Sequence, residues 1–146
     1  MSEKETATDI VEEKETKDTK QEQLEYVLEK TGLDLETINN WKRQHGSRNI
    51  HVLVLNEHEI YIFKSILRLE HKQLISQISG LEKEPEERKE ELYGEQLVSL
   101  CLLHPKVSTE FTSLSPAGLI PTLKDAIEIK SMFLPPALVI DSVVTL

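Results

Sequence analysis

Cys101 and His104 form the closest pairing of side chains that could do chemistry in this sequence. A thiolate beside an imidazole can act as a nucleophile or bind zinc, but zinc sites need three or four ligands at recognisable spacings. No CxxC or HExxH pattern accompanies the pair, although the chain has five histidines. His51 and His58, either side of a predicted turn, are not expected to meet as a site. We therefore interpret Cys101 as a core residue and predict no metal and no cofactor.

The carboxylates Glu86, Glu87, Glu90 and Glu91 could in principle act as general acids or bases. Their place at the polar start of a predicted helix indicates solvated groups with ordinary pKa values. The five glycines are scattered mainly at turns, and no GxGxxG, GxxxxGKS or GxSxG arrangement is present. The sequence therefore predicts a protein that is not an enzyme.

A basic cluster of Lys42, Arg43 and Arg48 follows a helical pattern that begins near Leu35, which suggests a helix-turn-helix DNA reader as the alternative function. The basic residues lie at the C-terminal end of that helix, however, and base-reading residues are usually N-terminal. The formal net charge of the chain is -9. Binding to a phosphate backbone needs clustered cations, so we do not expect a nucleic-acid partner.

The helices and strands that would position these side chains are predicted to begin after a charged N-terminal segment. Residues 1–22 carry only two large apolar residues, Ile10 and Val11, and are predicted to form a disordered acidic tail. No apolar run approaches the ~20 residues of a membrane span, and the N-terminus lacks a secretory signal. The sequence thus predicts a soluble intracellular protein without a membrane partner.

Residues 23–134 are predicted to form one α+β domain. Apolar residues at helical spacing indicate a helix, a turn at Gly32 and a second helix capped by Asp34 and ended by Gly46. Residues 49–65 read as a β-hairpin around Asn56-Glu57, pairing Val52 with Tyr61, Ile50 with Phe63 and Leu53 with Ile60. Both of its faces are apolar, so it must pack on helices or extend a sheet of another subunit.

Three further helices are predicted after the hairpin. They cover about residues 67–79, a stretch from about Pro85 until Pro105 stops it, and about 120–133, with Tyr93, Leu97, Leu100 and Cys101 as the buried stripe of the second. A polar linker separates the last two. Residues 135–146 are predicted to be an extended apolar C-terminal tail. The predicted fold is a β-hairpin packed against four or five α-helices.

The order of several short motifs resembles small proteins of tailed bacteriophages over about residues 38 to 133. The motifs are Trp41-Lys42 before a glycine turn, Tyr61-Ile62-Phe63, Arg68-Leu69-Glu70, Cys101 to Pro105, and Gly118 to Leu123. The chain departs from the pattern in having Ser131-Met132-Phe133 where the family tends toward Ser-Gly-Phe. These proteins resemble tail-assembly chaperones or minor virion components, which implies a late, non-catalytic role.

The resemblance implies other phage tail or virion proteins as partners, in the host cytoplasm during assembly or in the virion itself. Self-association remains open, as does the choice between a transient chaperone and a permanent subunit. The hairpin and the C-terminal tail offer edge-like, apolar surface for strand addition. We predict partner contacts at Tyr61, Phe63, Val139, Ile140, Val143 and Val144. Alternatively, the tail folds back on its own core.

Overall fold

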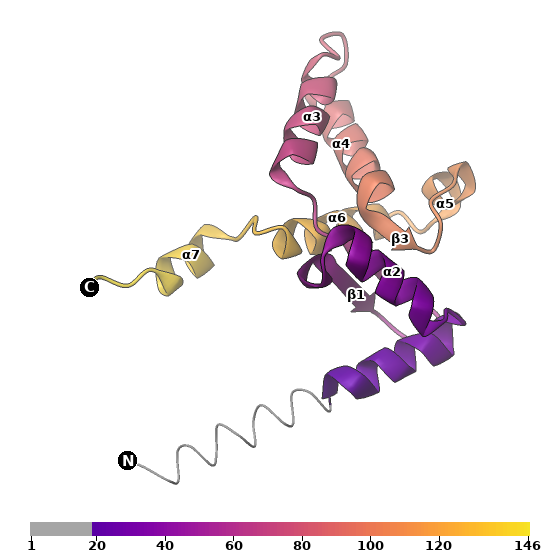
Figure 1. The fold of residues 1–146 in the computed structure, drawn as a ribbon. Helices are drawn as coiled ribbons and strands as arrows, with labels where there is room; N and C mark the ends of the chain where they lie inside the picture. Colours follow the sequence, from indigo (N-terminus) through magenta and orange to yellow (C-terminus); the bar gives the residue numbers. More distant parts are fainter. Residues whose placement is uncertain (1–18) are drawn as a thin grey trace.

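The structure is a computed structural model, and it describes residues 19–146. It confirms an α+β fold in which a β-hairpin packs against α-helices (Figure 1). The predicted tail lies mainly outside the described residues, but residues 19–22 belong to a helix over residues 19–31. The later elements are α2 (Leu35–His45), η1 (Ser47–Asn49), β1 (Ile50–Val54), β2 (Ile60–Lys64), α3 (Arg68–Ser79), α4 (Glu86–Cys101), β3 (Leu102–His104), α5 (Thr109–Leu114), α6 (Leu119–Lys130) and α7 (Pro136–Ser142).

The predicted caps of α2 are confirmed. The Asp34 side chain accepts a hydrogen bond from the backbone N–H of Thr37 at 2.9 Å, and the N–H of Gly46 donates to the carbonyl of Lys42. Gly46 has a φ of 91°, a conformation that a residue with a Cβ rarely adopts. Lys42, Arg43 and His45 lie in the last turn, where cations complement the helix dipole.

Among the described residues, three antiparallel strands form one sheet in the order β1-β2-β3. The central strand β2 is buried along its whole length. The third strand was not predicted: α4 ends at Cys101, and Leu102–His104 pair with β2 where a helix was expected to continue to Pro105. Pairing with β2 supplies the hydrogen bonds of this segment, a tertiary effect that helical periodicity does not reveal.

The predicted hairpin register is wrong by one residue. Leu53 lies opposite Tyr61 and Val52 lies opposite Ile62, whereas we predicted Val52 opposite Tyr61. The predicted pairs Ile50 with Phe63 and Leu53 with Ile60 are likewise not formed. The hydrogen bond from Leu55 N–H to the Glu59 carbonyl encloses three residues, not two. The Asn56 side chain accepts hydrogen bonds from the backbone N–H groups of His58 and Glu59 and supports this wider turn.

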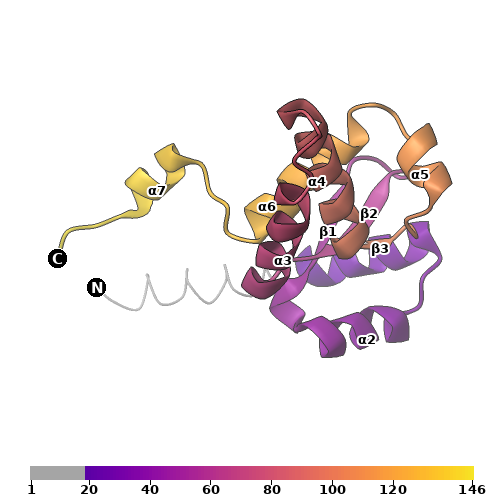
Figure 2. The same cartoon turned by 90° about the horizontal axis from the view of Figure 1, so that it is seen from above.

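Apolar clusters cover both faces of the sheet, as the two apolar faces of the hairpin predicted. The larger cluster, here the large core, joins Tyr61 and Phe63 to α3, α4 and α6. The small core joins Ile60 and Ile62 to the helix over residues 19–31 and to α2. Figures 1 and 2 show α2 on one side of the sheet and α3 and α4 on the other.

Some predicted positions differ in detail. Leu97 and Cys101 are fully buried, but Leu100 is 44% exposed, and Gly94 and Val98 complete the buried stripe of α4 instead. The predicted linker contains the short helix α5. The predicted extended tail is helical over α7, and Pro135 and residues 143–146 lack helical structure.

Candidate interaction site

Residues 135–146, here called the arm, leave the body of the protein and are exposed throughout (Figures 1 and 2). Pro135 has φ and ψ values of -59° and 142°, and Pro136 opens α7. Two successive prolines make this exit stiff and extended. Beyond it, the exposed large apolar residues are Leu138, Val139, Ile140, Val143, Val144 and Leu146.

Four of the predicted contact residues therefore lie together on accessible surface. Ile140, Val143 and Val144 are each more than 70% exposed, and Val139 is 43% exposed. The alternative in which the arm folds back on its own core is not the conformation found here. Tyr61 and Phe63, by contrast, are only 7% and 2% exposed, because both side chains pack in the large core against helices on that face of the sheet. Their prediction as partner contacts is corrected.

The base of the arm is held by the end of α6. The N–H of Phe133 donates to the carbonyl of Glu128 and the N–H of Met132 donates to that of Ile129, which together form a Schellman motif. Met132 sits at the left-handed position of this motif, with a φ of 73°. The Phe133 ring then packs on His71 of α3, with ring centroids 4.9 Å apart.

A second set of contacts, here called the clamp, ties α6 to the end of β2. The Ser65 hydroxyl donates to the Lys130 carbonyl at 3.1 Å, and the backbone N–H of Ile66 donates to the Ser131 hydroxyl at 2.9 Å. His51 Nε2 lies 2.8 Å from the Ser65 hydroxyl and brings β1 into the same set. Burial, with a smaller effect of the Lys130 charge, lowers the pKa of His51. The arm therefore starts from a fixed point beside the beginning of β1.

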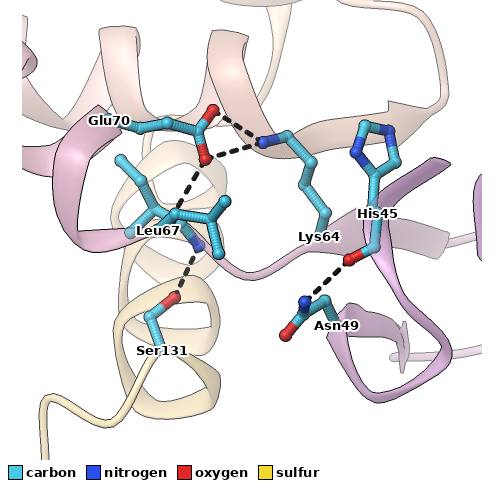
Figure 3. A network of polar contacts seen from close by, with 7 residues as sticks. His45, Asn49, Lys64, Leu67, Glu70 and Ser131 are labelled. Atoms are coloured by element: carbon cyan, nitrogen blue, oxygen red, sulfur yellow. Dashed lines mark hydrogen bonds and ion pairs between the residues drawn. The ribbon is translucent and has the colours of Figure 1, made fainter.

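Lys64 and Glu70 reinforce this junction (Figure 3). The Lys64 ammonium donates to both Glu70 carboxylate oxygens, at 2.9 and 3.1 Å, and Glu70 also accepts from the backbone N–H of Leu67 at the start of α3. Burial raises the pKa of Glu70, but the hydrogen bonds from Lys64 and Leu67 outweigh it and leave the pKa below its ordinary value. The Lys64 side chain is only 11% exposed whereas that of Glu70 is 31% exposed, so the ammonium is the more buried partner of this ion pair.

A shallow groove of about 160 Å³ lies at the other side of the sheet, between the helix over residues 19–31 and α2. Its floor is apolar, and among the described residues that line it Lys20 and Lys42 carry positive charge. The lining residues are Lys20, Gln23, Leu24, Val27, Ile38, Lys42, Ile50, His51, Val52 and Ile62. Lys42, considered above for DNA binding, is therefore a rim residue of an apolar groove.

Cys101 and Tyr93 are held in the packed interior between helices. Burial raises the pKa of the Cys101 thiol to about 12, which keeps it protonated and unreactive at neutral pH. The Tyr93 hydroxyl lies 3.3 Å from both His71 Nε2 and Glu128 and links α3, α4 and α6. Burial, together with the Glu128 charge, raises the pKa of Tyr93 to about 12. Within residues 19–146, no cluster of three or more His, Cys, Asp or Glu side chains could hold a metal.

Comparisons with known proteins add no relative. No family model matches the chain, no curated protein matches it, and no solved structure matches it. Over the part of the chain that is described, no helix is both long and apolar enough to cross a bilayer. The class that the fold and site define is a small α+β domain carrying an exposed apolar arm.

Proposed function

We propose that this chain is a non-catalytic assembly or structural protein of a tailed bacteriophage, and that its arm binds other tail or virion proteins. The observation that supports this proposal best is the exposure of six large apolar side chains within residues 135–146. Contiguous apolar surface of this kind on a small protein usually marks a binding site.

Apolar burial would drive binding of the arm, and the ordering of its backbone would oppose binding. Burying one Val, Leu or Ile side chain stabilises a complex by about 1.5–3 kcal/mol. Ordering the arm opposes this by roughly 1–2 kcal/mol per residue fixed, but the two prolines restrict the exit and lower this cost. The arm thus has an apolar surface large enough to bind, and its backbone is partly preorganised to do so.

The phage role rests on the motif order described above. The resemblance points to a tail-assembly chaperone, acting in the host cytoplasm, or to a minor subunit retained in the virion. Either role uses binding without chemistry. Both agree with a clamp that anchors a projecting arm to a rigid body.

The test is co-purification with the products of the neighbouring genes, since phage tail genes lie in clusters. We expect the full chain to retain a partner and the chain lacking residues 135–146 to lose it. Val143→Asp and Val144→Asp together should weaken retention at least about ten-fold, because a buried unpaired carboxylate is strongly unfavourable. Leu114→Asp on α5, where Leu114 is 75% exposed, is the matched control. Equal retention by the arm variants and the control would refute the role of the arm.

A further inference from the structure

We propose that residues 143–146 of one copy add as a fourth strand to the outer edge of β1 in a second copy. In this complex Asp141 of the first copy forms ion pairs with Lys20 and Lys42, which line the groove of the second copy. This inference rests on the proposed function of the arm as a binding element, and it names both the receiving surface and the occupant.

The outer edge of β1 has backbone groups free to pair. Ser65 donates to the Asn49 carbonyl and Leu55 donates to the Glu59 carbonyl, so these are hydrogen-bonded pairs of the ladder. Because bonded and non-bonded pairs alternate in an antiparallel ladder, the N–H and C=O groups of Ile50, Val52 and Val54 point away from β2. In the described part of the chain, β1 has no strand on that side, and these groups make no backbone hydrogen bond to another element.

The end of the arm has the complementary properties. Val143 is already extended, with φ and ψ of -82° and 128°, and residues 144–146 follow it without helical structure. The segment reads Val-Val-Thr-Leu, which is rich in β-branched residues that favour strands. An exposed sheet edge and an unpaired apolar segment are the two components of strand addition.

Side chains on one face of the added strand would pack in the groove. Ile50 and Val52 belong both to the edge of β1 and to the groove lining, so a strand beside β1 lies along the apolar floor. Among the residues that the structure describes, Lys20 and Lys42 line the groove and no acidic side chain does. Asp141 is the only charged side chain between residues 131 and 146. The charges on the two surfaces are therefore opposite, which fixes the orientation of the arm.

The structure favours a second copy over the chain's own groove. The Pro135-Pro136 exit and α7, which is roughly 10 Å long, carry residues 143–146 away from the body (Figures 1 and 2). The clamp holds the start of the arm in that direction. Reciprocal exchange of two arms would close into a two-fold dimer, a common outcome when identical chains swap a terminal element.

A charge-swap rescue tests the proposed contact in the full chain. We expect K20E/K42E, and separately D141K, to weaken self-association measured by light scattering about three- to ten-fold. The triple variant K20E/K42E/D141K should regain most of the original association. Circular dichroism checks that each variant is folded at the temperature of the measurement, because Lys42 also stabilises the end of α2. Equal weakening in the triple variant, or no effect of either swap, would overturn the proposal.

The strand itself is tested at Val52, whose N–H faces outward. Val52→Pro removes this donor without breaking a bond to β2, while Val52→Ala keeps the donor and loses most of the side chain. We expect the proline variant to weaken association at least about ten-fold more than the alanine variant. Equal effects would argue against strand addition.

Intermolecular paramagnetic broadening provides a test that does not alter β1. A spin label at Val144→Cys on unlabelled protein is mixed with ¹⁵N-labelled wild type; Cys101 is fully buried and should not take the label. We expect broadening of the amides of Ile50–Val54. A second sample carries the spin label and ¹⁵N in the same molecule, diluted into unlabelled wild type. Broadening of these amides in the second sample but not in the first would assign the groove to the chain's own arm. Broadening in the first sample that appears only after residues 1–18 are deleted would mean that the N-terminal residues occupy the groove. Either result overturns the proposal. A monomer at about 1 mM that still binds neighbouring gene products would overturn it while leaving the proposed function intact.

Discussion

Met132 adopts a left-handed backbone conformation that only glycine accepts without strain. The left-handed conformation destabilises a non-glycine residue by about 1–2 kcal/mol, and glycine would remove this strain. Glycine also loses more backbone entropy on folding, which cancels roughly 0.5–1 kcal/mol of the gain. Met132→Gly should therefore raise the free energy of unfolding by about 0.5–1 kcal/mol in urea denaturation. Met132→Ala is the control, because the Met132 side chain is 75% exposed and alanine keeps the strain. A destabilised glycine variant would contradict this account.

Glu70 makes the junction of β2 and α3 sensitive to acid. Its pKa is lower in the folded chain than the ordinary value of 4.5, so its stabilising effect is complete above that value and disappears as the pH falls through the folded pKa. Glu70→Gln should lower the free energy of unfolding by about 1–2 kcal/mol at pH 7, allowing for partial exposure. The difference from wild type should shrink below about pH 4. Chemical denaturation across this range measures it, and a constant difference would refute it.

Local residue effects were predictable, and long-range ones were not. Asp34 and Gly46 act within one turn of the chain, so their types and spacing predicted the caps of α2. Ser65 and Ser131 are 66 residues apart, and nothing in their spacing indicates that both belong to the clamp. Tyr61 and Phe63 were predicted to be contacts because their apolar character alone does not show which neighbours cover them.

At the scale of elements, α4 and α6 approach each other closely at Gly94. A Cβ built there would lie 3.5 Å from Lys124 Cδ and 3.8 Å from Ile120 Cγ2, which are ordinary contact distances. Gly94→Ala should therefore fit, and it should raise the free energy of unfolding by about 0.5–1 kcal/mol through helix propensity. Gly94→Leu should lower it by about 1–3 kcal/mol, because the larger side chain must separate the helices. Thermal unfolding of both variants distinguishes this close approach from a loose contact.

Element types were easier to predict than their pairing. The helical periodicities of α3, α4 and α6 and the alternation of the hairpin were sufficient to predict the α+β class. The register depended on a single side chain, Asn56, which widens the turn by one residue. The strand β3 follows α4 without a break and is a strand only because β2 lies beside it. Such pairing depends on the assembled fold, so the local sequence does not predict it.

At the scale of the whole molecule, the sheet contributes residues to both cores, whereas the arm contributes to neither. The sheet and the arm should therefore differ in their rates of amide hydrogen exchange. The amides of β2, which lies between both cores, should exchange only on global unfolding. The amides of α7 should exchange nearly as fast as those of a free peptide in dilute protein, because a seven-residue helix without buried residues is not stable alone.

With increasing protein concentration, protection should appear in α7 and residues 143–146 and at the outward N–H groups of Ile50, Val52 and Val54 together. The outward N–H groups are the decisive ones, since the N–H groups of His51 and Leu53 already bond to β2 and should change little. Protection of α7 that does not depend on concentration would instead mean that the arm packs on its own domain.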